Sequence, residues 1–158
     1  MTINNSFKFI FAIAISQAAG IIGSIFTVSA IQTWYTDLIK PVFNPPNWLF
    51  APVWTILYFL MGIAAYLIWK EGLNKKEVRL ALGLFLIQLM LNALWSMIFF
   101  GLQNPSWAFA EIIILWLAIL ATLMSFIRIS KTAAWLLSPY FLWVNFAAYL
   151  NCAIWLLN

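Results

Sequence analysis

Long uncharged stretches, separated by short clusters of charged residues, dominate the pattern of this chain. Between Lys8 and Asp37 lie 28 uncharged residues, and between Lys40 and Lys70 lie 29. A helix needs about 20 apolar residues to cross a bilayer, so each stretch holds one crossing and not two. Runs such as IIILWLAILA do not alternate as the strands of a membrane barrel would. We therefore predict a single domain over residues 1–158, an all-α integral membrane bundle with five transmembrane helices at residues 9–31, 51–69, 80–102, 106–127 and 134–157.

The first apolar segment has one other interpretation, a cleaved signal peptide, because Val28-Ser29-Ala30 resembles a cleavage site. A signal peptide, however, has an apolar core of roughly 7–15 residues behind a basic front. The apolar segment here is longer than that and follows a single basic residue, Lys8. These features favour a retained helix.

The composition supports a membrane protein. Hydrophobic residues make up 66% of the chain and charged residues 8%, which is too little polar cover for a small soluble domain and the opposite of a disordered chain. Eight basic and four acidic residues give a net charge of +4, too little for a nucleic-acid-binding surface. With no His and one Cys, the chain lacks the ligands for zinc sites of the usual type or His-ligated haem. We expect no required cofactor or metal, and we interpret Cys152 as a packing thiol.

The basic residues predict an orientation. With five crossings, the N-terminus, the second loop and the fourth loop share one side of the membrane. Lys40 is the single basic residue expected on the opposite side. Basic residues concentrate on the cytoplasmic side of membrane proteins, so we predict a bacterial inner (cell) membrane protein with its N-terminus in the cytoplasm and its C-terminus outside. The seven basic residues on the predicted cytoplasmic side are Lys8, Lys70, Lys75, Lys76, Arg79, Arg128 and Lys131.

The loop at residues 32–50 is too long for a simple connection. Pro41, Pro45 and Pro46 stiffen its backbone. Its aromatic side chains could anchor it to the bundle, although aromatic residues are also common at membrane interfaces. The prolines favour a structured lid docked over the outer end of the bundle. The aromatic residues of the lid are Trp34, Tyr35, Phe43 and Trp48.

Each apolar helix carries polar and aromatic residues at helical spacing, and therefore on one face. Polar groups facing lipid are costly, so these faces should point into the bundle. They could serve only as hydrogen bonds between helices. The mixture of amides with large aromatic rings instead favours a pocket for a large, flat, hydrophobic ligand, such as a porphyrin-like macrocycle bound without an axial His, or a sterol. The faces comprise Gln17, Gly20, Ser24 and Thr27; Trp54, Tyr58, Met61 and Ala65; Gln88, Asn92, Trp95 and Ser96; and Tyr140, Trp143, Ala147 and Asn151.

Two further features have alternative interpretations. Glu111 falls near the outer end of the fourth helix, and we interpret it first as an interfacial residue and second as a functional one. The small-xxx-small pairs Ala19/Gly23 and Gly20/Ser24 favour close helix packing, either within the bundle or across a dimer.

A series of short motifs extends from about residue 34 to the C-terminus. The motifs are Trp34-Tyr35, Lys40-Pro41, Asn44-Pro45-Pro46, Trp48, Pro52-Val53-Trp54, Leu57-Tyr58, Gln88-Leu89, Leu91-Asn92, Trp95, Phe99-Phe100-Gly101, Trp107-Ala108, Pro139-Tyr140, Trp143 and Leu150-Asn151. With these motifs the chain resembles the TspO/MBR family, the tryptophan-rich sensory and translocator proteins. The resemblance implies a five-helix membrane bundle that is usually a homodimer, and some members lie in outer membranes of bacteria or mitochondria.

The resemblance also implies a pocket under the first loop that binds porphyrins and haem precursors, and in animal members cholesterol and synthetic drugs. By position, Trp54 and Trp143 are similar to the tryptophans linked to light-dependent breakdown of protoporphyrin, so they are the candidate catalytic residues. Many members have Trp where this chain has Phe43, and the animal cholesterol motif is absent after Tyr149. The candidate ligand-binding residues are Trp34, Phe43, Trp48, Tyr58, Asn92, Trp95, Trp107, Tyr140, Ala147 and Leu150.

Three functions are consistent with these features. The first is a membrane protein that binds protoporphyrin IX, haem or other hydrophobic ligands and has a sensory, regulatory or transport role. The second is a light-dependent porphyrin-degrading enzyme that uses tryptophan radicals. The third is a transporter of small hydrophobic solutes. The expected partners are membrane lipid, the hydrophobic ligand and a second copy of the chain, with no nucleic acid.

Overall fold

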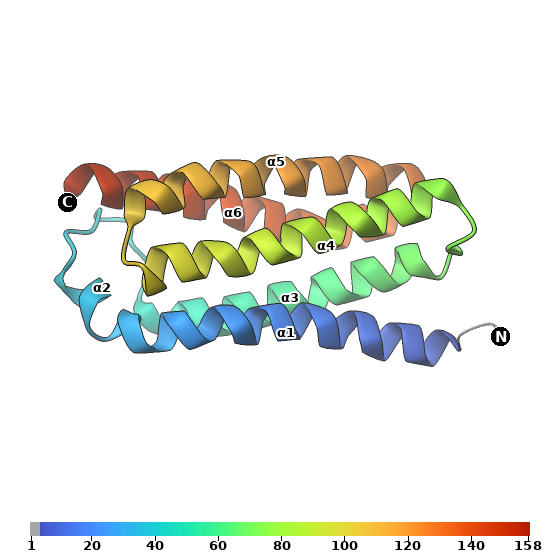
Figure 1. Cartoon of the computed structure of the whole chain (residues 1–158), viewed down its shortest axis with the longest axis horizontal. Helices are drawn as coiled ribbons and strands as arrows, with labels where there is room; N and C mark the ends of the chain where they lie inside the picture. Colours follow the sequence, from blue (N-terminus) through green and yellow to red (C-terminus); the bar gives the residue numbers. More distant parts are fainter. Residues whose placement is uncertain (1–3) are drawn as a thin grey trace.

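The structure is a computed structural model that describes residues 4–158. Five helices are long and apolar enough to cross a membrane, which confirms the predicted count and the all-α class. A one-turn helix lies in the loop between the first two of them, and a π-helical turn continues the third (Figure 1). The elements are α1 (Asn5–Ile31), α2 (Trp34–Asp37), α3 (Asn47–Trp69), α4 (Lys76–Ser96), η1 (Met97–Gly101), α5 (Pro105–Ile129) and α6 (Lys131–Leu157).

The five long helices begin between one and four residues earlier than the hydrophobic pattern predicts. Polar residues at the helix starts explain part of this difference, because a side-chain oxygen can accept a hydrogen bond from an otherwise unpaired N–H of the first turn. The side chains of Asn4, Asn104 and Ser130 cap α1, α5 and α6 in this way. Bilayer thickness thus predicts the apolar part of each helix, and side-chain caps favour the earlier starts of α1, α5 and α6, whereas α3 and α4 begin early without such a cap.

The helices form a closed ring in which α1 packs against α3 and α4, α3 against α6, and α6 and α4 against α5. The two ends of the described chain lie at opposite ends of the bundle, as an odd number of crossings requires (Figure 1). The α3–α4 and α5–α6 connections lie at the N-terminal end, here called the inner end. The α1–α3 loop and the α4–α5 connection lie at the other end, here called the outer end (Figure 1).

Glycines bring α1 close to its neighbours. A Cβ atom at Gly62 of α3 would lie 2.6 Å from the Cα of Ile13 on α1. A Cβ atom at Gly23 of α1 would lie 3.1 Å from the Oγ of Ser96 at the end of α4. Gly23 of α1 therefore serves a contact within the bundle, while contacts of the small residues across a dimer stay a prediction.

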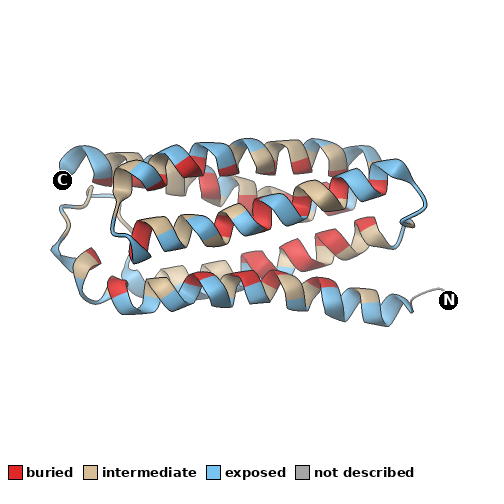
Figure 2. Cartoon of the chain, viewed as in Figure 1, coloured by how far each residue is buried: buried red, intermediate tan, exposed pale blue. Residues whose placement is uncertain are grey.

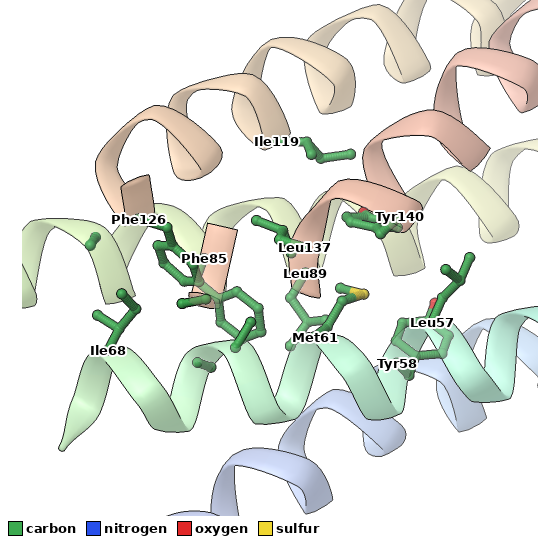
Figure 3. Close-up of a cluster of buried hydrophobic side chains, with 14 of the residues drawn as sticks. Leu57, Tyr58, Met61, Ile68, Phe85, Leu89, Ile119, Phe126, Leu137 and Tyr140 are labelled. Carbon is green, nitrogen blue, oxygen red and sulfur yellow. The ribbon is translucent and has the colours of Figure 1, made fainter. Parts of the chain in front are cut away.

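In the inner half of the bundle, α3, α4, α5 and α6 pack tightly against one another. Large side chains from four helices are fully buried there, and the rings of Phe85 and Phe126 stack with their centroids 6.0 Å apart (Figure 3). Buried residues follow the inward faces of the long helices, and exposed ones follow the outward faces (Figure 2). Many of the exposed residues are large and apolar, among them Ile21, Ile25 and Leu117, as expected of helices that contact lipid.

Candidate functional site

A cavity of about 320 Å³ occupies the outer half of the bundle, between α1, α3, α6 and the end of α4. This volume lies at the lower end of the roughly 300–1,000 Å³ that small-molecule pockets occupy. Its wall is mostly apolar and aromatic, and all the described residues that line it are uncharged. The polar lining residues are Gln17, Ser24, Thr27, Tyr35, Asn47, Thr55, Tyr58, Ser96 and Asn151.

Three tryptophans from three helices line this cavity: Trp54 on α3, Trp95 at the end of α4 and Trp143 on α6. The Trp54 ring lies against Tyr58, with centroids 5.5 Å apart, and Trp143 meets Phe50 edge-on at 6.4 Å. Indole rings offer a flat apolar face and one N–H donor, which suits them to stacking against a planar ligand.

The indole nitrogens differ in their hydrogen bonding. Trp95 donates its Nε1–H to the Oδ1 of Asn151 at 3.0 Å, and Asn151 donates in turn to the carbonyl of Pro105 at 2.8 Å. These bonds fix the orientation of the Trp95 ring. Among residues 4–158, Trp54 and Trp143 donate to no hydrogen-bond acceptor, so their N–H groups are available to a ligand.

A chain of hydrogen bonds lies beneath the cavity and links α3, α4 and α6. Tyr58 donates its hydroxyl to the Oδ1 of Asn92. The amide of Asn92 donates to the hydroxyl of Tyr140 at 3.0 Å, and Tyr140 donates to the Oε1 of Gln88 at 2.8 Å. All four residues are buried. This chain separates the cavity from the packed side chains of α3, α4, α5 and α6 below it, and Tyr58 belongs both to the chain and to the lining of the cavity.

The cavity opens sideways between α1 and α3. All of its exposed lining residues belong to these two helices. Two hydrogen bonds bridge the helices at the ends of the opening: Gln17 donates to the carbonyl of Thr55 at 3.2 Å, and Asn47 donates to the carbonyl of Ile31 at 3.4 Å. Since apolar residues such as Ile21 and Val28 form its α1 edge, the opening faces the lipid-exposed side of the bundle.

The predicted loop covers the outer end as expected, but it ends at residue 46 because α3 begins at Asn47, so Trp48 belongs to that helix and not to the lid (Figure 1). Tyr35 of α2 is the main anchor of the lid. Tyr35 is only 2% exposed and packs against Phe50, Phe99 and Phe100. Its hydroxyl donates to the Oδ1 of Asn44 at 2.7 Å within the same loop. Burial raises the pKa of Tyr35 from 10.0 to about 12, although its hydrogen bond with Asn44 lowers it in part.

A second set of contacts ties the lid to α6. Phe43 stacks on Tyr149 with centroids 5.1 Å apart. The side chain of Asn158 bonds both backbone groups of Ile39: its Oδ1 accepts from the amide at 2.9 Å, and its Nδ2 donates to the carbonyl at 3.0 Å. The lid is therefore held at two places, at the end of α4 and at the end of α6.

The structure divides the candidate residues into four groups. The residues that line the cavity are Trp54, Tyr58, Trp95, Trp143, Ala147 and Leu150. Asn92 and Tyr140 lie in the hydrogen-bonded chain beneath it, and Trp34 and Phe43 contact the bundle from the lid, Trp34 edge-on to Phe99 at 5.6 Å. Trp48 and Trp107 lie outside the lining and are 71% and 69% exposed.

Several aromatic residues that line the cavity are not among the candidates predicted from the sequence: Phe50, Phe99, Phe100 and Phe146. The π-helical turn η1 turns Phe99 and Phe100 inward, and both are buried. Such turns occur often at functional sites, but no pattern in the local sequence predicts one. Phe50 could have been found, because it precedes Trp54 by four residues and so shares a face of α3 with it.

Glu111 is not interfacial, and our first interpretation of it is wrong. It lies on the inward face of α5 together with Ala108, Ile112 and Leu115, and it is only 6% exposed. Neither of its carboxylate oxygens has a hydrogen-bond partner within residues 4–158. Ionisable residues inside membrane spans are costly, and they are often functional.

Comparison with known proteins agrees with this architecture. The family model described as the TspO/MBR family matches residues 12–156. The chain belongs to the TspO/MBR family. Its TspO/MBR relatives include the tryptophan-rich protein TspO of Chlorobaculum tepidum, 48% identical over 92% of both chains, and that of Archaeoglobus fulgidus, 47% identical over 98% of this chain and 99% of the relative. The human translocator protein is 40% identical over 85% of this chain and 80% of its own length. Membership confirms the resemblance and, with the five apolar helices, an integral membrane protein.

Proposed function

We propose that this TspO/MBR protein binds a porphyrin or a similar flat hydrophobic molecule in the outer cavity, in a sensory, regulatory or transport role. The observation that carries the proposal is the placement of Trp54, Trp95 and Trp143 around one cavity beneath a docked lid. Rigid aromatic rings with few polar groups suit a ligand held by stacking and by apolar burial.

The uncharged wall places a constraint on how a porphyrin would sit. Protoporphyrin carries two carboxylates, and a carboxylate buried without a partner costs several kcal/mol. We therefore expect the macrocycle to enter the aromatic part of the cavity while its carboxylates stay at the edge. Lys40 of the lid is the basic residue that lies nearest in the sequence to a residue lining the cavity. Its Nζ already donates to the carbonyls of Thr36 and Leu38.

The test is a titration of the purified protein with protoporphyrin IX in the dark, followed by tryptophan fluorescence and porphyrin absorbance. We expect saturable quenching that Trp54→Ala and Trp143→Ala weaken by about tenfold or more, since each removes a stacking ring. Trp135→Ala is the matched control, because Trp135 is exposed at the inner end of α6. Protoporphyrin dimethyl ester should bind about as tightly as the diacid.

Two results would reject this function. One is quenching that rises linearly without saturation, as expected from partition into detergent. The other is saturable quenching that Trp54→Ala and Trp143→Ala leave as strong as Trp135→Ala does. The variant Trp107→Ala tests whether Trp107 is a pocket-wall residue, as the family resemblance implies. Because Trp107 is exposed in the structure, we expect this variant to bind the porphyrin with unchanged affinity.

The second candidate function is light-dependent oxidation of the bound porphyrin. It is favoured by Trp54 and Trp143, which line the same cavity and whose indole N–H groups have no acceptor within residues 4–158. Indoles in van der Waals contact with an excited porphyrin could exchange electrons with it, with dioxygen as the final oxidant. Neighbouring aromatic rings extend from each: Trp54 lies 6.2 Å from Tyr140, and Trp143 lies 5.5 Å from Phe146.

Illumination separates this chemistry from binding. In the presence of dioxygen we expect the porphyrin absorbance to fall and a product band to grow until it saturates. Trp54→Phe and Trp143→Phe keep an apolar ring and should slow the product band more than they weaken dark binding. Equal product rates in the parent and both variants would eliminate the radical mechanism and leave the binding function intact.

We also propose that the inner end faces the cytoplasm and that the protein resides in a bacterial cell membrane. The α3–α4 connection and the first turns of α4 carry four basic residues against two acidic ones, whereas Lys40 is the one basic residue of the outer loops. Reporter fusions to the α3–α4 and α4–α5 connections test this orientation. A phosphatase active on the α3–α4 connection, which lies on the basic side, would contradict it.

A further inference from the structure

A second cavity, of about 360 Å³, lies in the inner half between α1, α3 and α4. It shares no lining residue with the outer cavity. Its lining is almost entirely apolar, with Phe11, Ala12 and Ile15 from α1, and Leu82, Phe85 and Leu86 from α4.

The surroundings of Gly83 also indicate unoccupied space in this cavity. A Cβ atom added to Gly83, one of the lining residues, would meet no other atom within 4 Å. The other described glycines would bring a Cβ atom within about 3 Å of a neighbour. The surface of α4 at Gly83 is therefore unoccupied by this chain.

The cavity is open to the surroundings on one side. Phe11, Leu73 and Leu86 line it and are exposed, so its mouth lies towards α1, α4 and the α3–α4 connection. Trp69 lines it from α3, and the buried indole Nε1–H of Trp69 has no acceptor within residues 4–158. An apolar space that opens among lipid-facing residues suits an acyl chain.

Arg79 lines the mouth and gives it a positive charge. One guanidinium nitrogen donates to the carbonyls of Leu73 and Asn74 at 2.7 and 3.1 Å, which holds the side chain at the end of α4. The carboxylates nearest in sequence are Glu71, which pairs with Lys75 at 3.7 Å, and Glu77. Residues 70–79 carry two negative charges and four positive ones, on Lys70, Lys75, Lys76 and Arg79.

We propose that this inner cavity binds one acyl chain of an anionic phospholipid, with the phosphate at Arg79. The cavity lies at the basic end of the bundle, where the headgroups of one leaflet would be. Arg matches a phosphate through bidentate hydrogen bonds, and each basic residue near an anionic surface adds about 1 kcal/mol to lipid attraction, a factor of about five. This site does not depend on the proposed porphyrin function.

Native mass spectrometry of the delipidated protein tests the proposal. The probes are dioleoyl phosphatidylglycerol and dioleoyl phosphatidylcholine, which share their chains and differ in charge. We expect one phosphatidylglycerol per monomer, retained about fivefold or more strongly than phosphatidylcholine. Gly83→Leu fills the cavity and should abolish this bound lipid, while Ala110→Leu introduces the same side chain at an exposed position on α5 and should not.

The charge is tested separately. Arg79→Gln should reduce the preference for phosphatidylglycerol to within about twofold while a lipid still binds, and Arg128→Gln, at the inner end of α5, should leave the preference unchanged. The thermal unfolding midpoint in detergent shows that each variant is folded. Equal retention of both lipids by the parent protein would overturn the proposal. Unchanged retention in Gly83→Leu, or lipid found only in dimers with a second copy covering the cavity, would also overturn it.

Discussion

The ring of Tyr58 lies so close to Gly20 that a Cβ atom at position 20 would come within 2.6 Å of two ring carbons. The same tyrosine donates its hydroxyl to Asn92 and lines the outer cavity. The contact between α1 and α3, the polar chain beneath the cavity and the cavity itself therefore depend on one side chain.

Substitution of Gly20 tests this dependence. Gly20→Ala should lower stability by about 1–3 kcal/mol, because the Tyr58 ring cannot move away without weakening its hydrogen bond. Porphyrin affinity should fall as well, since Tyr58 would shift into the cavity. Thermal unfolding in detergent and the dark titration measure the two effects. The control is Gly83→Ala, which meets open space and should raise stability by up to about 1 kcal/mol through helix propensity. Equal effects of the two changes would contradict the close contact.

Removal of Asn92 should disconnect the polar chain. Asn92→Leu leaves the hydroxyls of Tyr58 and Tyr140 without their shared partner, so we expect a loss of about 1–3 kcal/mol from the free energy of unfolding. The double variant Tyr58→Phe/Asn92→Leu removes one unpaired hydroxyl and should recover part of the loss. If the double variant is as unstable as the sum of the single variants, these residues are not coupled.

Glu111 gives a prediction of the opposite sign. A carboxyl group buried without a hydrogen-bond partner destabilises the fold, so Glu111→Leu should raise the thermal unfolding midpoint, by an amount equivalent to about 1–3 kcal/mol. Glu77→Gln, at an exposed position in the first turn of α4, is the control and should change it little. A lower midpoint for Glu111→Leu would mean that the carboxyl has a partner, such as a bound ligand, that offsets its burial.

The lid should respond to alkaline pH through Tyr35. Its pKa is about 12 in the folded lid against 10.0 for a solvated tyrosine, so the docked lid favours the neutral phenol. The stability of docking is unaffected below pH 10.0 and falls as the pH rises from 10.0 towards 12. The difference in ultraviolet titration between the parent and Tyr35→Phe should show a phenolate that forms near pH 12. A difference centred near pH 10 would show that Tyr35 is solvated and the lid undocked.

The sequence alone predicts the fold of this protein better than its site. Charged clusters such as Lys70–Arg79 interrupt apolar stretches of nearly bilayer length, so the number of crossings follows from one physical requirement. The prolines of residues 32–50 likewise indicate a structured lid. Both predictions rest on local properties of the chain, which need no knowledge of how the helices rotate against one another.

The rotation of each helix about its own axis determines which tryptophans reach the cavity. Local sequence patterns predict this rotation less well than they predict the number of crossings. Trp107 shares its first turn of α5 with Ala108, but Ala108 is buried and Trp107 points outward. The spacing of Ala108, Glu111, Ile112 and Leu115 would have identified the inward face, had the carboxyl not suggested an interfacial position. The π-helical turn before Leu102 shifts the helical register in a way that no periodicity anticipates.

The outer cavity and the inner cavity share no lining residue, which has a consequence for the passage of a ligand through this protein. A molecule that enters the outer cavity between α1 and α3 meets the hydrogen-bonded phenols of Tyr58 and Tyr140 at its inner end. Buried side chains of α3, α4, α5 and α6 lie behind these phenols. Unless the helices separate, we expect it to return to the leaflet from which it came. The resting bundle would thus exchange ligands with one side of the bilayer, and a transport role would require the helices to separate.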